Sequence, residues 1–140
     1  MIYYIGKYKK GERGAKNMTL HESGQMYLEA IYVLLQQNTN IRAIDVGAYL
    51  GYSKPSVSRA VGILKNAEYI TVDEDGFIKM TDAGRQIAEQ LYERHTVISN
   101  MLMALGVDEK TATEDACRIE HVISDKSFAA VKDHYLNYKK

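Results

Sequence analysis

Three side chains near the C-terminal end of the sequence could hold a metal ion together. Cys117, Glu120 and His121 stand at positions i, i+3 and i+4, so on a helix they share one face beside an apolar stripe. A thiolate, a carboxylate and an imidazole on one face form three convergent metal ligands. Each residue also has an ordinary interpretation, as a buried thiol, a solvated carboxylate or a surface histidine. The spacing indicates a metal site, and this interpretation needs further candidate ligands elsewhere in the chain.

Three further residues give that support. His95 interrupts the apolar stripe of a long predicted helix, where burial of an unpartnered imidazole is costly. Met26 and Glu29 stand at i and i+3 on the first predicted helix, Leu20 to Gln37, and offer a thioether and a second carboxylate. A lone methionine in a stripe is ordinarily core, and a lone helical glutamate is ordinarily solvated. Taken together, the six residues predict a donor set drawn from separate helices.

A second group of residues suits contact with DNA. A short predicted helix over residues 42–50 is followed by Gly51 and by a third helix that Ser53 caps. Two short helices about a tight turn that contains glycine are typical of a helix-turn-helix motif. The candidate DNA contacts are Arg42, Ser53, Lys54, Pro55, Ser56, Ser58, Arg59 and Lys65.

The start of this third helix has the chemistry that a recognition helix needs. Its serine hydroxyls can reach phosphate oxygens, Pro55 can pack on a thymine methyl group, and Arg59 can pair with guanine O6 and N7. Lys54 and Lys65 would add attraction that does not depend on the base sequence. The alternative is that the serines and the proline only cap a helix and that Arg59 is solvated.

The remaining patterns predict a mainly α-helical fold in two domains. Two β-prone runs, 69–72 and 77–80, flank an Asp-Gly turn and predict a small hairpin, or wing. Helices are expected from Thr81 to about Leu105, from Asp108 to about Ile123 and from Asp125 to about Tyr138. The expected organisation is a basic, loose tail at 1–17, a winged helix-turn-helix domain at 18–80 and a helical domain at 81–140.

Composition and charge narrow the classes of partner. The chain has 140 residues, 46% apolar and 26% charged, with a formal net charge of zero, so only local charge is informative. Basic side chains predominate over residues 41–65 and acidic ones over 86–125, which suits a front half that touches a polyanion and a back half that holds a cation. No stretch approaches the roughly 18 apolar residues that cross a bilayer, and no secretory signal is present, so we expect a cytoplasmic protein without a membrane partner.

Several sequence motifs together resemble a known family of regulators. The resemblance covers about Leu20–Tyr138. Its most specific parts are Met26-Tyr27-Leu28-Glu29-Ala30-Ile31-Tyr32, Ser53-Lys54-Pro55-Ser56-Val57-Ser58, Glu93-Arg94-His95 and Ala116-Cys117-Arg118-Ile119-Glu120-His121-Val122-Ile123-Ser124-Asp125. These motifs resemble the metal-dependent repressors typified by the diphtheria toxin repressor and the manganese transport regulator, in a short form without an SH3-like domain. The resemblance implies a homodimer that binds a pseudo-palindromic, double-stranded operator with a divalent metal ion as co-repressor and controls metal-uptake genes.

The resemblance also implies two sets of metal ligands. The primary site would contain Met26, Cys117, Glu120 and His121, as in the iron-responsive branch. A second site would contain Glu29 and His95. We expect it to be weak or altered, because Ser99 and Thr113 stand where the iron branch has a carboxylate and a histidine.

The implied ligands bear on the choice of metal. The manganese branch has carboxylates at the positions of Met26 and Cys117, whereas a thioether and a thiolate favour softer ions. The expected order is therefore Fe(II) first and Mn(II) next, with Co(II), Ni(II) or Zn(II) accepted in vitro.

Three other functions stay open on the sequence. A thiol redox sensor would use Cys117 as a reactive nucleophile. A metallohydrolase would use Glu120 or Glu29 as a base, but the sequence shows no substrate cleft or oxyanion device. We therefore expect that the protein is not an enzyme and has no small organic substrate. A metal-independent winged-helix repressor would bind its operator equally with and without a chelator.

Overall fold

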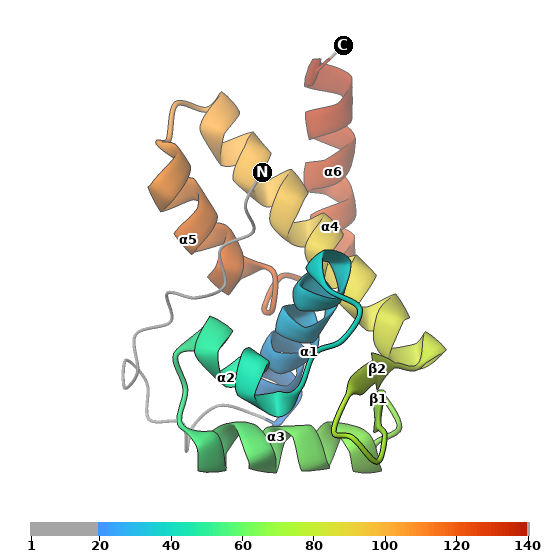
Figure 1. The fold of residues 1–140 in the computed structure, drawn as a ribbon. Coiled ribbons are helices and arrows are strands. Elements are labelled where there is room, and N and C mark those ends of the chain that lie inside the picture. Colours follow the sequence, from blue (N-terminus) through green and yellow to red (C-terminus); the bar gives the residue numbers. More distant parts are fainter. Residues whose placement is uncertain (1–19, 140) are drawn as a thin grey trace. The chain divides into compact units, whose positions relative to one another are not determined.

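A computed structural model describes the backbone of residues 20–139 and the side chains of residues 23–137. The chain divides into two compact units between Glu89 and Gln90. The elements are α1 (Leu20–Gln37), α2 (Ala43–Leu50), α3 (Lys54–Asn66), β1 (Ile70–Val72), β2 (Ile78–Met80), α4 (Asp82–Ala104), α5 (Glu109–Ile119) and α6 (Asp125–Lys139) (Figure 1). This confirms the predicted mainly α-helical fold with a winged helix-turn-helix. None of the described helices is both long and apolar enough to cross a membrane.

The first unit is built on one apolar core. Helices α2 and α3 pack against each other, and both pack against α1 (Figure 1). The inward stripe of α1 includes Leu28 and Ile31, and it meets Val46 from α2, Val57 from α3 and Ile78 from the hairpin. All five side chains are buried, so removal of their apolar surface from water holds the recognition helix in place.

The turn between α2 and α3 has the local chemistry that the sequence predicts. Gly51 adopts the left-handed conformation with φ of 72°, and its N–H donates to the carbonyl of Gly47 at 2.8 Å. Ser53 then caps α3, because its hydroxyl accepts from the Ser56 amide at 3.4 Å. Pro55 lies in the first turn, where its missing N–H costs nothing.

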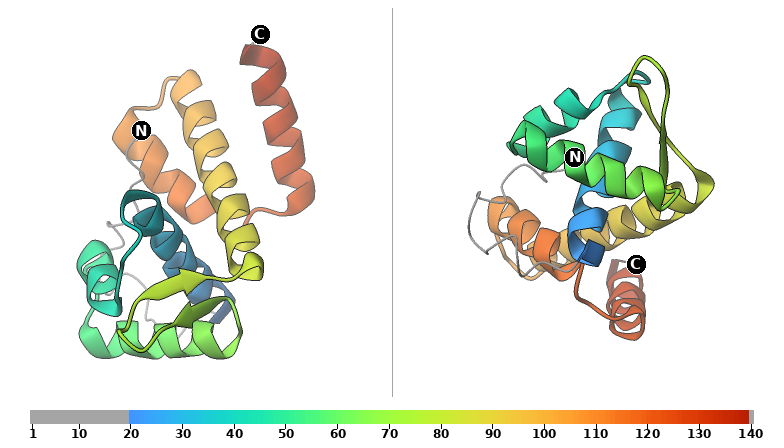
Figure 2. Two further views of the ribbon diagram at one scale, coloured as in Figure 1. Left: turned by 45° about the vertical axis from the view of Figure 1, so that its right-hand side comes forward. Right: turned by 90° about the horizontal axis from the view of Figure 1, so that it is seen from below.

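The wing is a two-stranded antiparallel hairpin in which Ile70 is opposite Met80 (Figure 2). Its turn is closed by the Asp73 carboxylate, which accepts from the amides of Asp75 and Phe77, both at 2.9 Å. The hairpin is also fixed to the segment before α2, because the Ile78 amide donates to the Ile41 carbonyl at 2.8 Å. The wing therefore has a defined place in the first unit.

The start of α4 leaves no room for a side chain at Gly84. A β-carbon there would lie 2.1 Å from the carbonyl oxygen of Tyr69, a backbone atom that cannot rotate away. We expect Gly84→Ala to lower the free energy of unfolding by about 1–3 kcal/mol, the usual cost of overpacking. Urea denaturation followed by circular dichroism measures the change.

Gly62 provides the matched control, because it lies inside α3 and a β-carbon added there would meet no neighbouring atom within 4 Å. Gly62→Ala should raise the free energy of unfolding by about 0.5–1 kcal/mol, since alanine is the better helix former. Equal effects of the two substitutions would contradict the close approach at Gly84.

The second unit packs the remainder of α4 against α5 and α6. Its core contains Ile98 of α4, Ala116 of α5 and Phe128 of α6. The helical spacing of Ile87, Leu91, Ile98, Leu102 and Leu105 predicts that all five face inward. Leu105 is instead 72% exposed, because it follows Ala104, the last residue of α4. The residues that link α4 to α5 then reach Asp108, whose carboxylate accepts from the Thr111 amide at 3.0 Å and caps α5.

Helix α5 ends at Ile119, about four residues before the expected end near Ile123. Hydrogen bonds tighten beyond that point, since the Val122 amide donates to the Ile119 carbonyl at 3.0 Å. Glu120 is therefore the residue that caps the helix, and His121 lies in the turn that follows.

Candidate metal centre and DNA-binding surface

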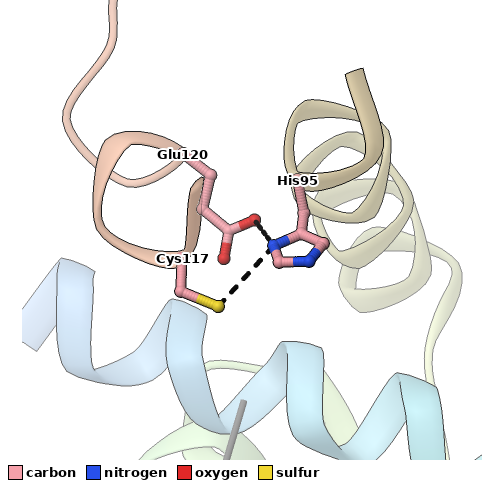
Figure 3. A group of neighbouring side chains, drawn as sticks. All are labelled: His95, Cys117 and Glu120. Carbon is pink, nitrogen blue, oxygen red and sulfur yellow. Dashed lines mark hydrogen bonds and ion pairs between the residues drawn. The ribbon is translucent and has the colours of Figure 1, made fainter. Parts of the chain in front are cut away.

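Three buried donors converge in the second unit. His95 lies on α4, Cys117 lies on α5, and Glu120 is the residue that follows α5 (Figure 3). His95 Nδ1 lies 3.6 Å from Cys117 Sγ and 3.6 Å from Glu120 Oε2. One ligand atom from each of the three residues lies within 4.8 Å of the other two. The relative exposures are 0%, 5% and 1%, so the cluster is shielded from solvent.

The end of α5 explains how Cys117 and Glu120 share one face although the helix stops at Ile119. Glu120 keeps right-handed helical angles, φ of −57° and ψ of −28°, so its side chain still projects one turn beyond Cys117. His121 lies outside the helix, yet its Nε2 is 3.4 Å from Glu120 Oε1. The predicted trio is thus brought together by a helix end rather than by a continuous helix.

The charge states favour metal binding at this cluster. Burial, reinforced by the nearby His121, lowers the pKa of His95 to about 4, so the imidazole is neutral near pH 7. A neutral imidazole keeps a lone pair for a metal ion. A buried carboxylate is costly unless it is paired or coordinates a cation. A thiol, an imidazole and a carboxylate, all buried and mutually close, therefore fit a divalent transition-metal ion.

The predicted DNA contacts all lie on the surface of the first unit. Every one of the eight candidate residues is exposed. Seen from below, α3 lies in front of the other described helices of its unit (Figure 2). The Ser53 hydroxyl donates to the Ser56 hydroxyl at 2.9 Å, so these two groups cap the helix and still reach solvent.

Arg42 has an additional partner that the sequence patterns did not indicate. Its guanidinium lies over the ring of Phe77, at 4.4 Å from the centroid, and its amide donates to the Asp45 carboxylate at 2.8 Å. Lys79 Nζ from the wing donates to the Thr39 carbonyl at 2.8 Å. The wing and the start of α2 therefore present their cations in fixed positions. Of these contacts, only the stacking of a cation on Phe77 could have been looked for in the sequence.

Two family models match this chain over nearly its whole length. Residues 19–77 match the N-terminal DNA-binding domain of the iron-dependent repressors, and residues 81–140 match their metal-binding and dimerisation domain. The chain belongs to the iron-dependent repressor family. This confirms the predicted relationship to the diphtheria toxin repressor and the manganese transport regulator.

Individual relatives agree with this family of metal-dependent transcriptional repressors. An uncharacterised HTH-type transcriptional regulator of Methanocaldococcus jannaschii is 30% identical over 115 residues, which are 81% of this chain and 92% of that protein. The HTH-type transcriptional regulator MntR of Bacillus subtilis is 30% identical over 107 residues, 76% of this chain and 75% of that one.

Solved structures of related regulators share the fold. The manganese regulator SloR superposes with a TM-score of 0.72 and 29% identity over 86% of this chain and 55% of its own. ScaR with bound Cd²⁺ gives a TM-score of 0.69 and 27% identity over 82% of this chain and 54% of its own. This repressor-family chain thus spans about half the length of these two structures.

The other predicted ligands of this repressor-family protein lie in the first unit. Met26 and Glu29 are both on α1, with exposures of 3% and 0%. The Met26 thioether accepts a hydrogen bond from the Tyr52 hydroxyl at 3.6 Å. Their assignment to metal sites rests on the family resemblance.

Two buried hydroxyls lie next to the cluster along its helices. Ser99 is one turn after His95 on α4, and Thr113 is one turn before Cys117 on α5, with exposures of 0% and 7%. Neutral hydroxyls are weaker metal ligands than the carboxylate and imidazole of the iron branch. The weak or altered second site that the resemblance implies stays a prediction.

Arg59 is the strongest candidate for reading a base in this repressor-family protein. Arg59→Ala should weaken binding to a specific duplex by about 5–150-fold, equivalent to about 1–3 kcal/mol, and relax the preference at one base pair. Fluorescence anisotropy at fixed salt, with duplexes changed at single positions, measures both effects. The control, Lys126→Ala, removes an exposed cation from the second unit and should leave the affinity unchanged.

Proposed function

We propose that this protein is a cytoplasmic homodimeric repressor that binds a pseudo-palindromic operator when it holds a divalent metal ion, and that it controls metal-uptake genes. The observation that carries the proposal is the buried convergence of His95, Cys117 and Glu120 in a member of the iron-dependent repressor family. In this proposal residues 18–80 read DNA, and residues 81–140 bind metal and form the dimer.

The proposed primary ligands are Met26, Cys117, Glu120 and His121, and the proposed second-site residues are Glu29 and His95. Proximity within the second unit supports the part of this set that lies there. His95 Nδ1 is as close to Cys117 Sγ as to Glu120 Oε2, 3.6 Å in each case. This proximity supports a role for His95 beside the primary donors, whereas its assignment to a second site rests on the family resemblance.

We propose Fe(II) as the first choice of metal and Mn(II) as the second. The sulfur donors support Fe(II), because soft ligands favour later transition metals over Mn(II). The family to which the chain belongs is that of the iron-dependent repressors. Manganese enters through the relatives, among them the manganese regulator SloR. Co(II), Ni(II) and Zn(II) should bind in vitro.

Coupling between metal and DNA follows from the origin of the donors. If Met26 of α1 shared a cation with Cys117, Glu120 and His121, as the resemblance implies, these residues would cross-link the DNA-binding domain to the dimerisation domain. In the dimer, this link would fix the separation of the two recognition helices at about 34 Å, close to one helical turn of DNA. By linkage, DNA must tighten metal binding by the same factor as metal tightens DNA binding, typically about 5–150-fold.

One anaerobic titration tests the proposal. Apoprotein is titrated with Fe(II) or Mn(II) at fixed salt, while anisotropy follows a duplex that the metal-loaded protein has selected from a random library. We expect tight binding only with metal, at lower free Fe(II) than free Mn(II). Binding that is equal with and without a chelator would refute metal dependence. Rapid labelling of Cys117 by iodoacetamide that Fe(II) does not slow would favour a redox sensor.

A further inference from the structure

Arg94, the residue before His95 on α4, binds the segment that links α5 to α6. Its Nη1 donates to the carbonyls of Glu120 at 3.2 Å and of Ile123 at 2.7 Å. Its Nη2 pairs with the carboxylate of Asp125, and its guanidinium lies 5.5 Å from the centre of the Phe128 ring. The side chain is only 17% exposed, so most of this fork is removed from water.

These contacts meet a need that the end of α5 creates. The last carbonyls of a helix have no partner within the helix, and a cation near them complements the helix dipole. Arg94 satisfies the carbonyl of the residue that caps α5 and, three residues on, the carbonyl of Ile123. A planar guanidinium can bind several acceptors in a fixed geometry, which an ammonium group cannot.

Neighbouring residues on α4 therefore act on Glu120 at two levels. Arg94 holds its main-chain carbonyl, and His95 faces its carboxylate at 3.6 Å. We propose that Arg94 is a positioning residue of the metal centre: it fixes the backbone of Glu120 so that the carboxylate meets His95 and Cys117, and it thereby sets the affinity for divalent metal. This inference rests on the proposed metal-binding function.

A purely structural role for Arg94 makes a different prediction. In that case it would join α4 to α6, as does the pair formed by Glu93 Oε2 and Lys132 Nζ at 3.2 Å. Glu93 precedes Arg94, and both residues contact α6. The ion pair of Glu93 is with Lys132 and does not include a residue of the buried cluster. Glu93→Gln is therefore the matched control, since it weakens an α4–α6 ion pair without touching Glu120.

The test uses Co(II) as a spectroscopic probe of the full-length protein. Charge-transfer absorption from the Cys117 thiolate reports binding, and the ligand-field bands report the geometry of the donors. We expect Arg94→Ala to weaken Co(II) binding by about 10–100-fold, the usual effect of losing a group that orients a ligand, and to shift the ligand-field bands. Arg94→Lys should restore part of the affinity, and Glu93→Gln should resemble the wild type.

The outcomes separate the two proposals. If the wild type gives no Co(II) charge-transfer band that Cys117→Ala removes, the proposed metal centre is wrong. If the wild type gives the band and folded Arg94→Ala has the same affinity and spectrum, the role of Arg94 is refuted. Should Arg94→Ala fail to fold by circular dichroism, Arg94→Lys and Asp125→Asn decide, because a positioning role requires both to weaken Co(II) binding more than Glu93→Gln does.

Discussion

Cys117→Ala is expected to abolish the metal response of DNA binding and to leave a folded protein. The thiol is 5% exposed, lies 3.6 Å from His95 Nδ1 and belongs to the cluster of donors in the second unit that we assign to the metal. Its removal deletes a soft anionic ligand and leaves an imidazole and a carboxylate that bind divalent ions less tightly. The loss should exceed the roughly 10–100-fold effect of removing a supporting residue.

The fold should tolerate this substitution, because alanine removes one small buried atom from a well-formed helix. Large-to-small changes of this size cost about 1 kcal/mol in free energy of unfolding. Fe(II)-dependent anisotropy of the selected duplex measures the lost response, and circular dichroism with urea denaturation measures stability. His121→Ala should produce the same loss, since His121 Nε2 lies 3.4 Å from Glu120 Oε1.

Thr113→Val serves as the control for Cys117→Ala, since it changes a buried group one turn earlier on α5 without removing a proposed ligand. It should retain the Fe(II) response. Metal-dependent binding by Cys117→Ala at wild-type Fe(II) concentrations would contradict a ligand role for the thiol.

The sequence predicts those parts of the fold that local chemistry determines. The left-handed turn at Gly51, the cap at Ser53 and the Asp-Gly turn of the wing each depend on residues close in sequence. Such signals are readable because the backbone conformation is decided within a few residues. The apolar stripe of the third helix predicts in the same way that Val57 is in the core, where it is buried.

The structure differs from the sequence prediction where the conformation depends on residues that are distant in the sequence. Helix α5 ends at Ile119, and the carbonyls of Glu120 and Ile123 beyond it accept from Arg94, a residue more than 20 positions earlier whose role no local pattern in the sequence indicates. The proximity of His95 to both Cys117 and Glu120 depends on how α4 packs on α5, which periodicity does not specify. The sequence therefore indicates the donor types and one helical face, while their arrangement requires the packed helices.

Cys117→Asp is expected to change which metal activates the protein. An Asp side chain at this position would replace the soft thiolate by a hard oxygen donor of similar reach, beside the same imidazole and carboxylate. Oxygen ligands suit Mn(II), whereas thiolate selects for softer ions, so the ratio of Mn(II) to Fe(II) affinity should rise by at least about tenfold, equivalent to about 1.4 kcal/mol.

The measurement is a pair of anaerobic titrations, with Mn(II) and with Fe(II), that follow binding to the selected duplex. Cys117→Ser separates the loss of sulfur from the gain of a carboxylate, because serine keeps the size of the thiol and adds no charge. It should weaken both metals without favouring Mn(II). If Cys117→Ser raises the ratio as much as Cys117→Asp does, the loss of sulfur and not the gain of a carboxylate changes the selectivity. If the aspartate variant keeps the wild-type ratio, the donor atom at residue 117 does not determine metal selectivity. Selectivity would then have to arise from the donors that Cys117 shares the centre with, since those are common to all three proteins.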